Sequence, residues 1–438
     1  MITKNPPALK NRQNSIKPWQ VESVLSWLCA PRLLLVFTLV FVGGAVALGA
    51  PGWPQWGGVS RNFHVATAEL ADSWSSTPPR KVWRRALGDG YSGIASYASA
   101  LFTMYRKEDH ERIVCLDATS GDTVWEHSYT APHLPKTNLD PGPGPHANPL
   151  VVADKVFATG VTGNLHALDR VSGRVVWKHN LIEEYGGTVL YRGYSASPIA
   201  YEDRVIVPVG GQGNGVMAFL QKDGSVAWKS GDFDVSHSSP VLARVQDREQ
   251  LVVYASEVIV GLDPADGRIL WTAKHSSAGG YIASMPVVGA DGRLFFSGAY
   301  EGGSLCFQLQ PGDQPNAKEL WFTKRMRVHH SNVIRIGNFV YGASGDFGPV
   351  IFTALDLAVG KVVWQDRALA RASCIYADGK LIAMEDGGRL VLAKVSPKGL
   401  NILSSVELFD GRAWTPPTLI GKTLYIRNRT DIMAYALP

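Results

Sequence analysis

Short runs in which apolar and polar residues alternate recur along most of the chain and predict β-strands. Examples are KVFATG (155–160), RVIVPV (204–209), RLFFSG (293–298) and KTLYIR (422–427). An alternation with a period of two is typical of a strand that buries one face. No stretch beyond residue 50 sustains the apolar spacing of an amphipathic helix, so the pattern predicts an all-β domain.

A longer phrase repeats at regular intervals: an apolar strand ends in Asp, Gly follows four residues later, and Trp four residues after that. The complete copies are Asp117/Gly121/Trp125, Asp169/Gly173/Trp177, Asp263/Gly267/Trp271 and Asp356/Gly360/Trp364. The degraded copies are Leu220/Gly224/Trp228, Leu309 with Trp321 after a four-residue insertion, Val395/Gly399 with Leu403 in the Trp position, and Ala436. The seven intervals from Asp117 to Ala436 average about 46 residues, which is typical of a four-stranded propeller blade.

A second phrase, in which Pro precedes an apolar strand and usually follows a small or polar residue, opens most repeats. It reads ANPLVV (147–152), ASPIAY (196–201), SSPVLA (238–243), SMPVVG (284–289) and TPPTLI (415–420), with Pro-less forms at 331–336 and 372–377. Each repeat then has four strands, and eight repeats predict an eight-bladed β-propeller. The last repeat lacks its Trp strand, so we expect residues 80–87 around Trp83 to supply it and close the ring. A seven-bladed alternative discards the weak unit at 373–406.

The first 50 residues have a different composition from the rest. Residues 1–31 are basic, and 18 uncharged, mostly apolar residues follow from Leu33 to Ala50. A basic stretch before an apolar run is typical of an export signal, and the run is also long enough for a membrane-anchoring helix. We therefore expect a cytoplasmic tail at 1–31 and a signal peptide or inner-membrane anchor at 32–50. An N-terminal extension at 51–79 and the propeller at 80–438 would then lie outside the inner membrane.

Charge and cysteine content exclude other classes of protein. Five of the 43 basic residues and one of the 38 acidic residues lie in the first 50 positions, so the body carries a net charge of only +1. The body has no basic run of the kind that follows a phosphate backbone, and we expect no nucleic-acid partner. Cys115, Cys306 and Cys374 lie singly in apolar stretches, which predicts buried thiols rather than a disulfide framework.

The Asp-x-x-x-Gly-x-x-x-Trp phrase resembles the tryptophan-docking motif of quinoprotein-like (PQQ-like) eight-bladed propellers. The likeness is clearest in ALDRVSGRVVW (167–177) and ALDLAVGKVVW (354–364). The segment WPQW (53–56), with Arg61 after it, is similar to the start of many exported members of that family. The resemblance implies that each docking Trp packs between neighbouring blades and donates its N–H to a backbone carbonyl.

Two branches of this family imply different functions. One resembles the propeller subunit of the outer-membrane β-barrel assembly machinery and implies an exported scaffold that binds an envelope protein or a small anionic or aromatic ligand. The other comprises dehydrogenases that hold pyrroloquinoline quinone and Ca²⁺ in the axial cavity. This chain has neither their vicinal Cys–Cys nor a CxxCH haem motif, so we assign no cofactor. We expect a monomeric binding module rather than an enzyme, and a quinone-dependent oxidoreductase is the alternative.

Aligning the repeats on the second phrase places one residue of each blade at the mouth of its inner strand. In order, these residues are Ile94, His146, Ser195, His237, Ala283, His330, Arg371 and Trp414. The candidate ligand-binding residues of this axial funnel are His146, His237, His330, Arg371 and Trp414. For the three His a structural role, hydrogen bonding to the backbone where the strands begin, is the alternative. We assign no catalytic residue and no metal site.

Two long loops interrupt the repeat, at 131–146 and 182–194, and both lead into inner strands on one face. Long loops on one face of a propeller usually carry its binding specificity. His329 and His330 are adjacent in a predicted strand, so we expect their side chains to point to opposite faces and not to share a metal ion.

Overall fold

The computed structural model describes residues 52–438, except for Thr67, Lys136, Pro141, Pro311, residues 313–315 and Phe347. The expected tail at 1–31 and the signal or anchor at 32–50 lie outside the described residues. Among the residues that are described, no helix is both long and apolar enough to cross a membrane.

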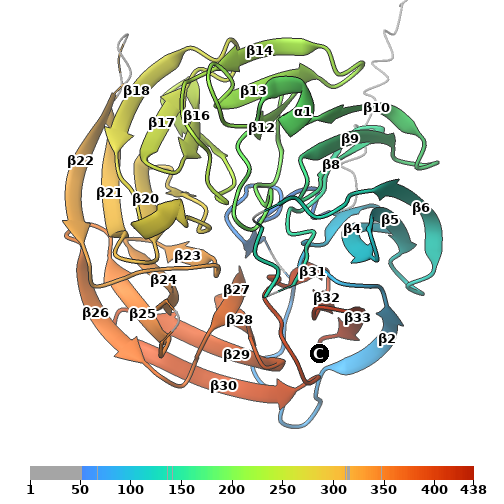
Figure 1. The fold of residues 1–438 in the computed structure, drawn as a ribbon. Coiled ribbons are helices and arrows are strands. Elements are labelled where there is room, and N and C mark those ends of the chain that lie inside the picture. Colours follow the sequence, from blue (N-terminus) through green and yellow to red (C-terminus); the bar gives the residue numbers. More distant parts are fainter. Residues whose placement is uncertain are drawn as a thin grey trace, which may run out of the picture. The chain divides into compact units, whose positions relative to one another are not determined.

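The described strands form eight sheets arranged as blades around a common axis (Figure 1). Blade 1 holds β3 (Ala95–Tyr97), β4 (Ala100–Lys107), β5 (His110–Asp117) and β6 (Thr123–Thr130), and blade 2 holds β7 (Leu150–Val152), β8 (Lys155–Thr159), β9 (Asn164–Asp169) and β10 (Val175–Asn180). Blade 3 holds β11 (Ile199–Tyr201), β12 (Arg204–Pro208), β13 (Val216–Leu220) and β14 (Val226–Ser230), and blade 4 holds β15 (Val241–Val245), β16 (Arg248–Tyr254), β17 (Val258–Leu262) and β18 (Ile269–Lys274).

The second half of the ring repeats this arrangement. Blade 5 holds β19 (Val287–Val288), β20 (Arg293–Gly298), β21 (Gly303–Gln310) and β22 (Asn316–Thr323), and blade 6 holds β23 (Val333–Ile336), β24 (Phe339–Ser344), β25 (Ile351–Asp356) and β26 (Lys361–Asp366). Blade 7 holds β27 (Ala372–Ala377), β28 (Lys380–Glu385), β29 (Arg389–Ser396) and β30 (Gly399–Glu407), and blade 8 holds β31 (Thr418–Ile420), β32 (Thr423–Arg427), β33 (Asp431–Ala436) and β2 (Arg80–Ala86). A short helix α1 (Leu181–Tyr185) and a 3-10 turn η1 (Ala278–Gly280) lie in the connections.

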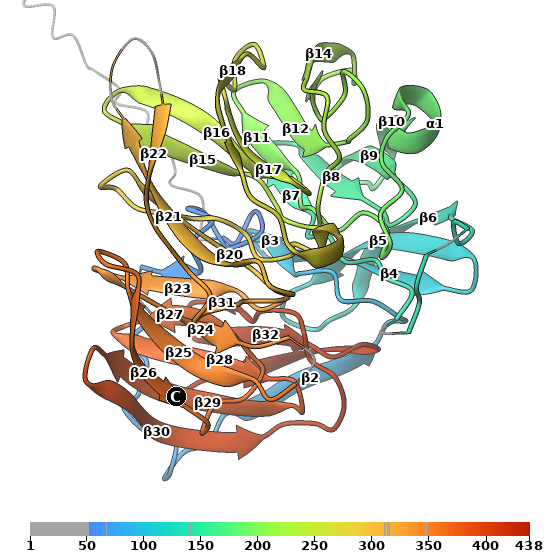
Figure 2. The ribbon, with the colours of Figure 1, turned by 60° about the vertical axis from the view of Figure 1, so that its left-hand side comes forward.

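The eight-bladed prediction is confirmed, and the seven-bladed alternative is wrong because the weak unit forms a complete four-stranded blade 7. Ring closure is also as predicted. Strand β2 pairs antiparallel with β33, with Trp83 opposite Ala434, and in both ribbon views β2 lies among the C-terminal strands (Figures 1 and 2). The N-terminal strand β2 therefore pairs with the edge of β33 that would otherwise be open where the ring closes.

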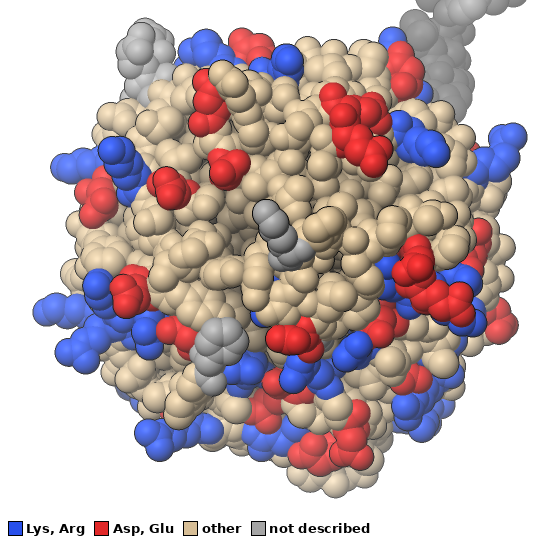
Figure 3. Space-filling model, viewed as in Figure 1, with Lys and Arg blue, Asp and Glu red and all other residues tan. Residues whose placement is uncertain are grey.

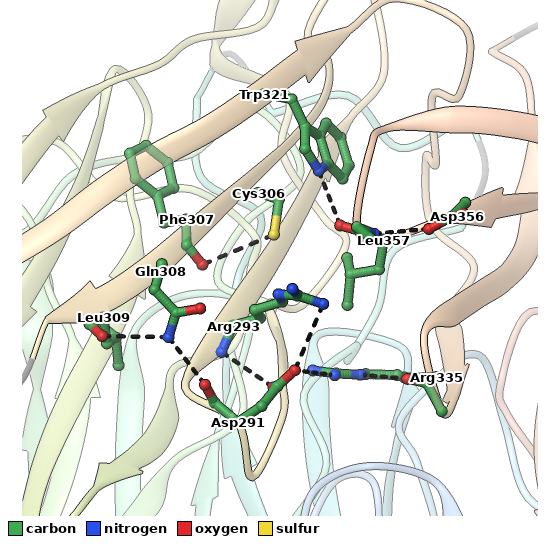
Figure 4. A network of polar contacts seen from close by, with 12 residues as sticks. Asp291, Arg293, Cys306, Phe307, Gln308, Leu309, Trp321, Arg335, Asp356 and Leu357 are labelled. Carbon is green, nitrogen blue, oxygen red and sulfur yellow. Dashed lines mark hydrogen bonds and ion pairs between the residues drawn. The ribbon is translucent and has the colours of Figure 1, made fainter.

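The docking tryptophans join each blade to the next, as the family resemblance implied. Six of them donate the indole N–H to the residue after the Asp position of the following blade. The pairs are Trp83 with Ala118, Trp125 with Arg170, Trp177 with Gln221, Trp228 with Pro264, Trp321 with Leu357 and Trp364 with Ser396, at 2.8–3.1 Å. Figure 4 shows one of these contacts beside the Asp291–Arg335 ion pair, which also links blade 5 to blade 6. The repeated Trp is thus a clamp between blades.

The repeated Gly has a matching cause. At Gly173 the backbone φ is +70°, and a Cβ would lie 2.6 Å from the ring of Trp125 in the preceding blade. Both the left-handed backbone and the approach of the indole require glycine. The Asp-Gly-Trp phrase is therefore one structural unit in which the Gly of one blade receives the Trp of the blade before it.

Residues 53–65 of the N-terminal extension enter the ring, whereas Trp74 lies against β30, the outermost strand of blade 7. The carbonyl of Trp53 accepts from the backbone N–H of Ser96 in blade 1, and the carbonyl of Pro54 accepts from Val151 N–H in blade 2. Strand β1 (His64–Val65) then pairs in parallel with the inner strand β27 of blade 7. In Figure 1 this blue segment lies in the middle of the ring. We call residues 53–65 the plug, because they contact the inner strands of blades 1, 2 and 7.

Candidate functional site: an aromatic funnel on the axis

A cavity of about 780 Å³ opens where the inner strands begin. Seven of the eight mouth positions predicted from the repeat line this cavity, all five candidate ligand-binding residues among them: His146, Ser195, His237, Ala283, His330, Arg371 and Trp414. The eighth, Ile94, is instead fully buried in the core between blades 8 and 1. The register of the repeat thus brings together side chains from seven blades, and we call this cavity the funnel.

Hydrogen bonds between neighbouring blades stabilise the funnel wall. They come from polar residues in the segments that lead into the inner strands. The contacts are Ser92 Oγ–H to Ala147 O, Asn148 N–H to Ser197 Oγ, Ser197 N–H to Ser239 Oγ, Ser238 Oγ–H to Ser284 O, Cys374 N–H to Asn332 Oδ1, Ser373 Oγ–H to Trp414 O and Thr415 Oγ1–H to Tyr91 O. Each joins one blade to the next beside a mouth residue. Small hydroxyl and amide side chains therefore satisfy the backbone at the Pro steps.

Aromatic rings follow one another around the funnel. Starting from His146, successive ring centroids are 4.4–6.1 Å apart through Tyr91, Trp414, His330, His329, Tyr300, Tyr281 and Tyr191. All eight rings line the cavity. We call them the aromatic collar. Neighbouring rings at such distances attract one another, so the collar is a packed wall rather than eight separate side chains.

The imidazoles in the funnel are neutral at neutral pH. Burial lowers the pKa of His146 to about 3 and the pKa values of His237 and His329 to about 4. The pKa of His330 is also well below its ordinary value, mainly because of burial and then because of His329 and nearby arginines. His237 Nδ1 lies 2.9 Å from Ser195 Oγ, a side-chain contact between blades 3 and 4. The rings therefore offer hydrogen-bond donors and acceptors but no positive charge.

Positive charge in the funnel comes from three arginines. Arg371 approaches Asp386 at 3.7 Å and donates to the carbonyl of Asp346. Arg192 donates to the carbonyl of Asn138, and Arg412 lies over the ring of Trp414 at 4.8 Å. Neither Arg192 nor Arg412 makes an ion pair with another of the described residues.

The plug forms the floor of the funnel. Trp56 lines the funnel on one side and a smaller cavity of about 320 Å³ on the other. Arg61 holds the plug in place: its guanidinium is buried and donates to the side chain of Gln55 and to the carbonyl of Pro198, both at 3.1 Å. Burial without an acidic partner lowers the pKa of Arg61 to about 9. Among the described residues, the plug therefore separates the funnel from the smaller cavity beneath it.

The two long loops predicted to carry specificity meet at the rim of the funnel. The backbone N–H of Asn138 donates to the carbonyl of Tyr191, and the Asn138 amide donates to the Tyr191 hydroxyl, at 2.8 and 2.7 Å. Leu139, Val189 and Tyr191 are 40%, 49% and 43% exposed. In the view down the axis, Lys, Arg, Asp and Glu side chains are frequent around the edge of this face (Figure 3).

The expectation that His329 and His330 lie in a strand and point to opposite faces was wrong. Both residues precede strand β23 instead of lying in it, and their Nδ1 atoms are 3.0 Å apart. Even so, the described residues contain no group of three His, Cys, Asp or Glu side chains placed to hold a metal ion. Of the described residues that line the funnel, only Asp140 and Asp346 are carboxylates, whereas Ca²⁺ takes six to eight oxygen ligands. The funnel does not fit the calcium that a quinone dehydrogenase holds.

Sequence reasoning missed several funnel residues. Tyr300 lies between β20 and β21, away from the mouth positions, so alignment on the Pro step could not find it. By contrast, Tyr281 lies two residues before the mouth position Ala283, and Tyr91 lies three residues before Ile94. Arg192 lies in one of the long loops, and Arg412 lies two residues before Trp414. Extending the alignment by two residues at each mouth position would have found Arg412.

Comparisons with known proteins match this architecture. A family model described as outer membrane protein assembly factor BamB matches residues 109–366. The protein of that name from Yersinia pestis is 24% identical over 319 residues, which are 69% of this chain and 77% of that protein.

Solved structures match over more of the chain but at lower identity. BamB from Moraxella catarrhalis has a TM-score of 0.58 at 16% identity and covers 82% of this chain and 100% of that chain. A europium-containing methanol dehydrogenase has a TM-score of 0.65 at 12% identity and covers 88% and 98% of the two chains. The quinohemoprotein alcohol dehydrogenase of Comamonas testosteroni has a TM-score of 0.60 at 11% identity, with 88% and 80% covered. At such identities the likeness establishes the fold alone.

Proposed function

The chain belongs to the family described as outer membrane protein assembly factor BamB, and on this premise we propose that it is an exported scaffold that binds another protein of the cell envelope. The observation that carries the proposal is the family match itself, which extends from blade 1 to blade 6. The ring adds support because a closed propeller with a concave face is a rigid platform for a partner.

The proposed location follows from the N-terminal sequence. A basic stretch before the apolar residues 33–50 directs the body out of the cytoplasm, with residues 32–50 as either a cleaved signal or an inner-membrane anchor. Sequencing the N-terminus of the mature protein separates the two, since a start near Ala50 means cleavage. A body that remains accessible only from the cytoplasm would contradict export in either form.

Photo-cross-linking in the native envelope tests the scaffold. In one variant of the full chain a photoreactive residue replaces Val189, which is exposed on the funnel face. In a second variant it replaces Val171, which is exposed in the turn after β9, at the opposite end of blade 2. We expect one discrete protein adduct from position 189 and a weaker adduct or none from position 171. Absence of a protein adduct from position 189 and from a second funnel-face position, Leu139, would rule out a partner on this face.

The oxidoreductase alternative has one observation in its favour, which is that Arg371 and Trp414 line the same axial funnel. Against it stands the poor fit of calcium described above. Adding pyrroloquinoline quinone and Ca²⁺ to the purified chain, and measuring the bound chromophore and dye reduction with alcohols or sugars, decides between the two. Dye reduction that depends on both additions would replace the scaffold proposal.

A further inference from the structure

The funnel carries positive charge that the described residues do not neutralise. Arg371 is paired with Asp386 at 3.7 Å, whereas Arg192 and Arg412 form no ion pair with a described residue, and two carboxylates, Asp140 and Asp346, line the funnel with them. One of these, Asp346, already forms a 3.1 Å ion pair with Arg327 outside the funnel. Because the imidazoles of the collar are neutral, they neither add to this charge nor offset it. A partner with negative charge therefore suits the site.

The residue types of the funnel match those that dominate protein–protein contacts. Tyr, Trp and Arg are the residue types enriched where an interface concentrates its binding energy. The funnel is lined by four Tyr, two Trp and three Arg: Tyr91, Tyr191, Tyr281, Tyr300, Trp56, Trp414, Arg192, Arg371 and Arg412. The four Tyr and Trp414 belong to the packed collar, which holds their rings in place before binding and lowers the entropy lost on association. Arg412 is further aligned by the Trp414 ring beneath it.

The rim shows that the ligand is larger than the cavity. Leu139, Val189 and Tyr191 stand on the two loops that meet above the funnel, and each is at least 40% exposed. A small molecule seated on the floor at Trp56 would leave these apolar side chains in water. A polypeptide segment that enters the funnel and leaves across the rim would cover them, and this burial is favourable.

We infer that the funnel binds an extended acidic segment of a protein partner. In this arrangement, Asp or Glu side chains of the segment meet Arg192 and Arg412, and apolar or aromatic side chains pack on the collar and on the rim. The inference rests on the proposed scaffold function and deepens it by naming the chemistry of the partner and the place where it docks. The plug lies beneath the funnel, so in this arrangement the segment enters and leaves by the opposite face.

Fluorescence anisotropy with the purified full chain tests the inference. The probe is a short fluorescein-labelled peptide in which Asp and Tyr alternate, and the comparison peptide has Lys in place of each Asp. We expect the acidic peptide to bind, the Lys peptide to bind at least tenfold more weakly, and binding to weaken as salt is raised. Arg192→Gln and Arg412→Gln should each weaken binding roughly fivefold.

Matched controls make the result specific. Arg244→Gln removes an exposed arginine from the far end of β15, where it contacts Asp247 and the carbonyl of Gln246, and should leave binding unchanged. Tyr191→Ser should weaken binding by removing rim contact while leaving the charge intact. Equal binding of the two peptides, or acidic-peptide binding unaffected by R192Q and R412Q, would overturn the inference. Displacement of the peptide by succinate at equal concentration would also overturn it, because the site would then take small anions.

The two proposals can fail separately. If Val189 cross-links to an envelope protein and R192Q with R412Q leaves that adduct unchanged, the scaffold stands and the acidic segment is wrong. If no funnel-face position gives an adduct while the acidic peptide still binds, the inferred chemistry stands and the scaffold in the native envelope is wrong.

Discussion

The indole N–H of Trp271 donates to the side-chain oxygen of Gln250 at 2.7 Å, within its own blade, whereas six other docking tryptophans reach across to the next blade. The cause lies in blade 5. There, β21 and β22 continue past the docking position, so that Gln310 pairs with Asn316 instead of forming the turn that would present a carbonyl. Gln250 supplies the missing acceptor, and both partners are buried.

Replacing Gln250 by Leu should destabilise the protein by about 1–3 kcal/mol, because it leaves the buried Trp271 N–H without an acceptor. Chemical denaturation of the variant measures the loss. In a Trp271→Phe background the same replacement should cost much less, since the unsatisfied donor is gone. If Q250L costs the same in both backgrounds, Gln250 acts through packing and the hydrogen bond is unimportant.

Gly173→Ala should destabilise the protein by about 2–4 kcal/mol, because the added methyl group meets the Trp125 ring and the backbone is left-handed. Gly379→Ala is the matched control, since its φ is +72° and a Cβ there meets nothing within 4 Å. Gly379→Ala should cost only about 1 kcal/mol, because the left-handed backbone is then the only source of strain. Thermal unfolding of the two variants compares them directly, and equal costs would mean that the indole contact contributes nothing.

The fold could be predicted from the sequence because each blade carries the same short motif at a regular spacing. Asp169, Gly173 and Trp177 each carry a separate physical requirement, and their spacing counts the blades. The mouth residues followed from the same register. The features that could not be predicted depend on contacts between residues whose separation in the sequence does not repeat from blade to blade. The docking of Trp271 on Gln250 requires knowing how far a neighbouring hairpin extends, and the plug lies on the axis through contacts that join residues far apart in the chain.

Glu111→Gln should destabilise the protein by about 3–5 kcal/mol, because it leaves the buried Arg106 guanidinium without its carboxylate. Arg106 and Glu111 are 2% and 0% exposed at their side chains, and Arg106 also donates to the carbonyl of Ala131 at the start of a long loop. Asp154→Asn is the control. It removes an exposed partner of Lys155 and should cost less than about 1 kcal/mol. Denaturation midpoints measure both, and equal values would contradict a role of the buried pair.

The free energy of unfolding should fall as pH is lowered from 6.5 to about 4.5, before most carboxylates titrate. The folded-state pKa values of His146, His237 and His329 lie at about 3 to 4, below the ordinary value of 6.5 that they regain on unfolding. In this range the unfolded chain therefore binds more protons than the folded chain, and stability rises with pH. Above pH 6.5 these three groups contribute fully to the free energy of unfolding. Below pH 6.5 each of them lowers that free energy by up to about 1.4 kcal/mol for every pH unit. The buried Glu111 carboxyl acts in the opposite direction, because burial raises its pKa.

Denaturant titrations at several pH values measure this slope, and His237→Gln should make it shallower, because one imidazole no longer takes up a proton on unfolding. The comparison of variant with wild type cancels the contribution of Glu111 and of the exposed carboxylates. A flat wild-type profile between pH 6.5 and 4.5, or a slope unchanged by H237Q, would mean that the funnel imidazoles are hydrated well enough to protonate in the folded protein. The funnel would then carry positive charge at mildly acidic pH, and its affinity for an acidic segment would increase there rather than stay constant.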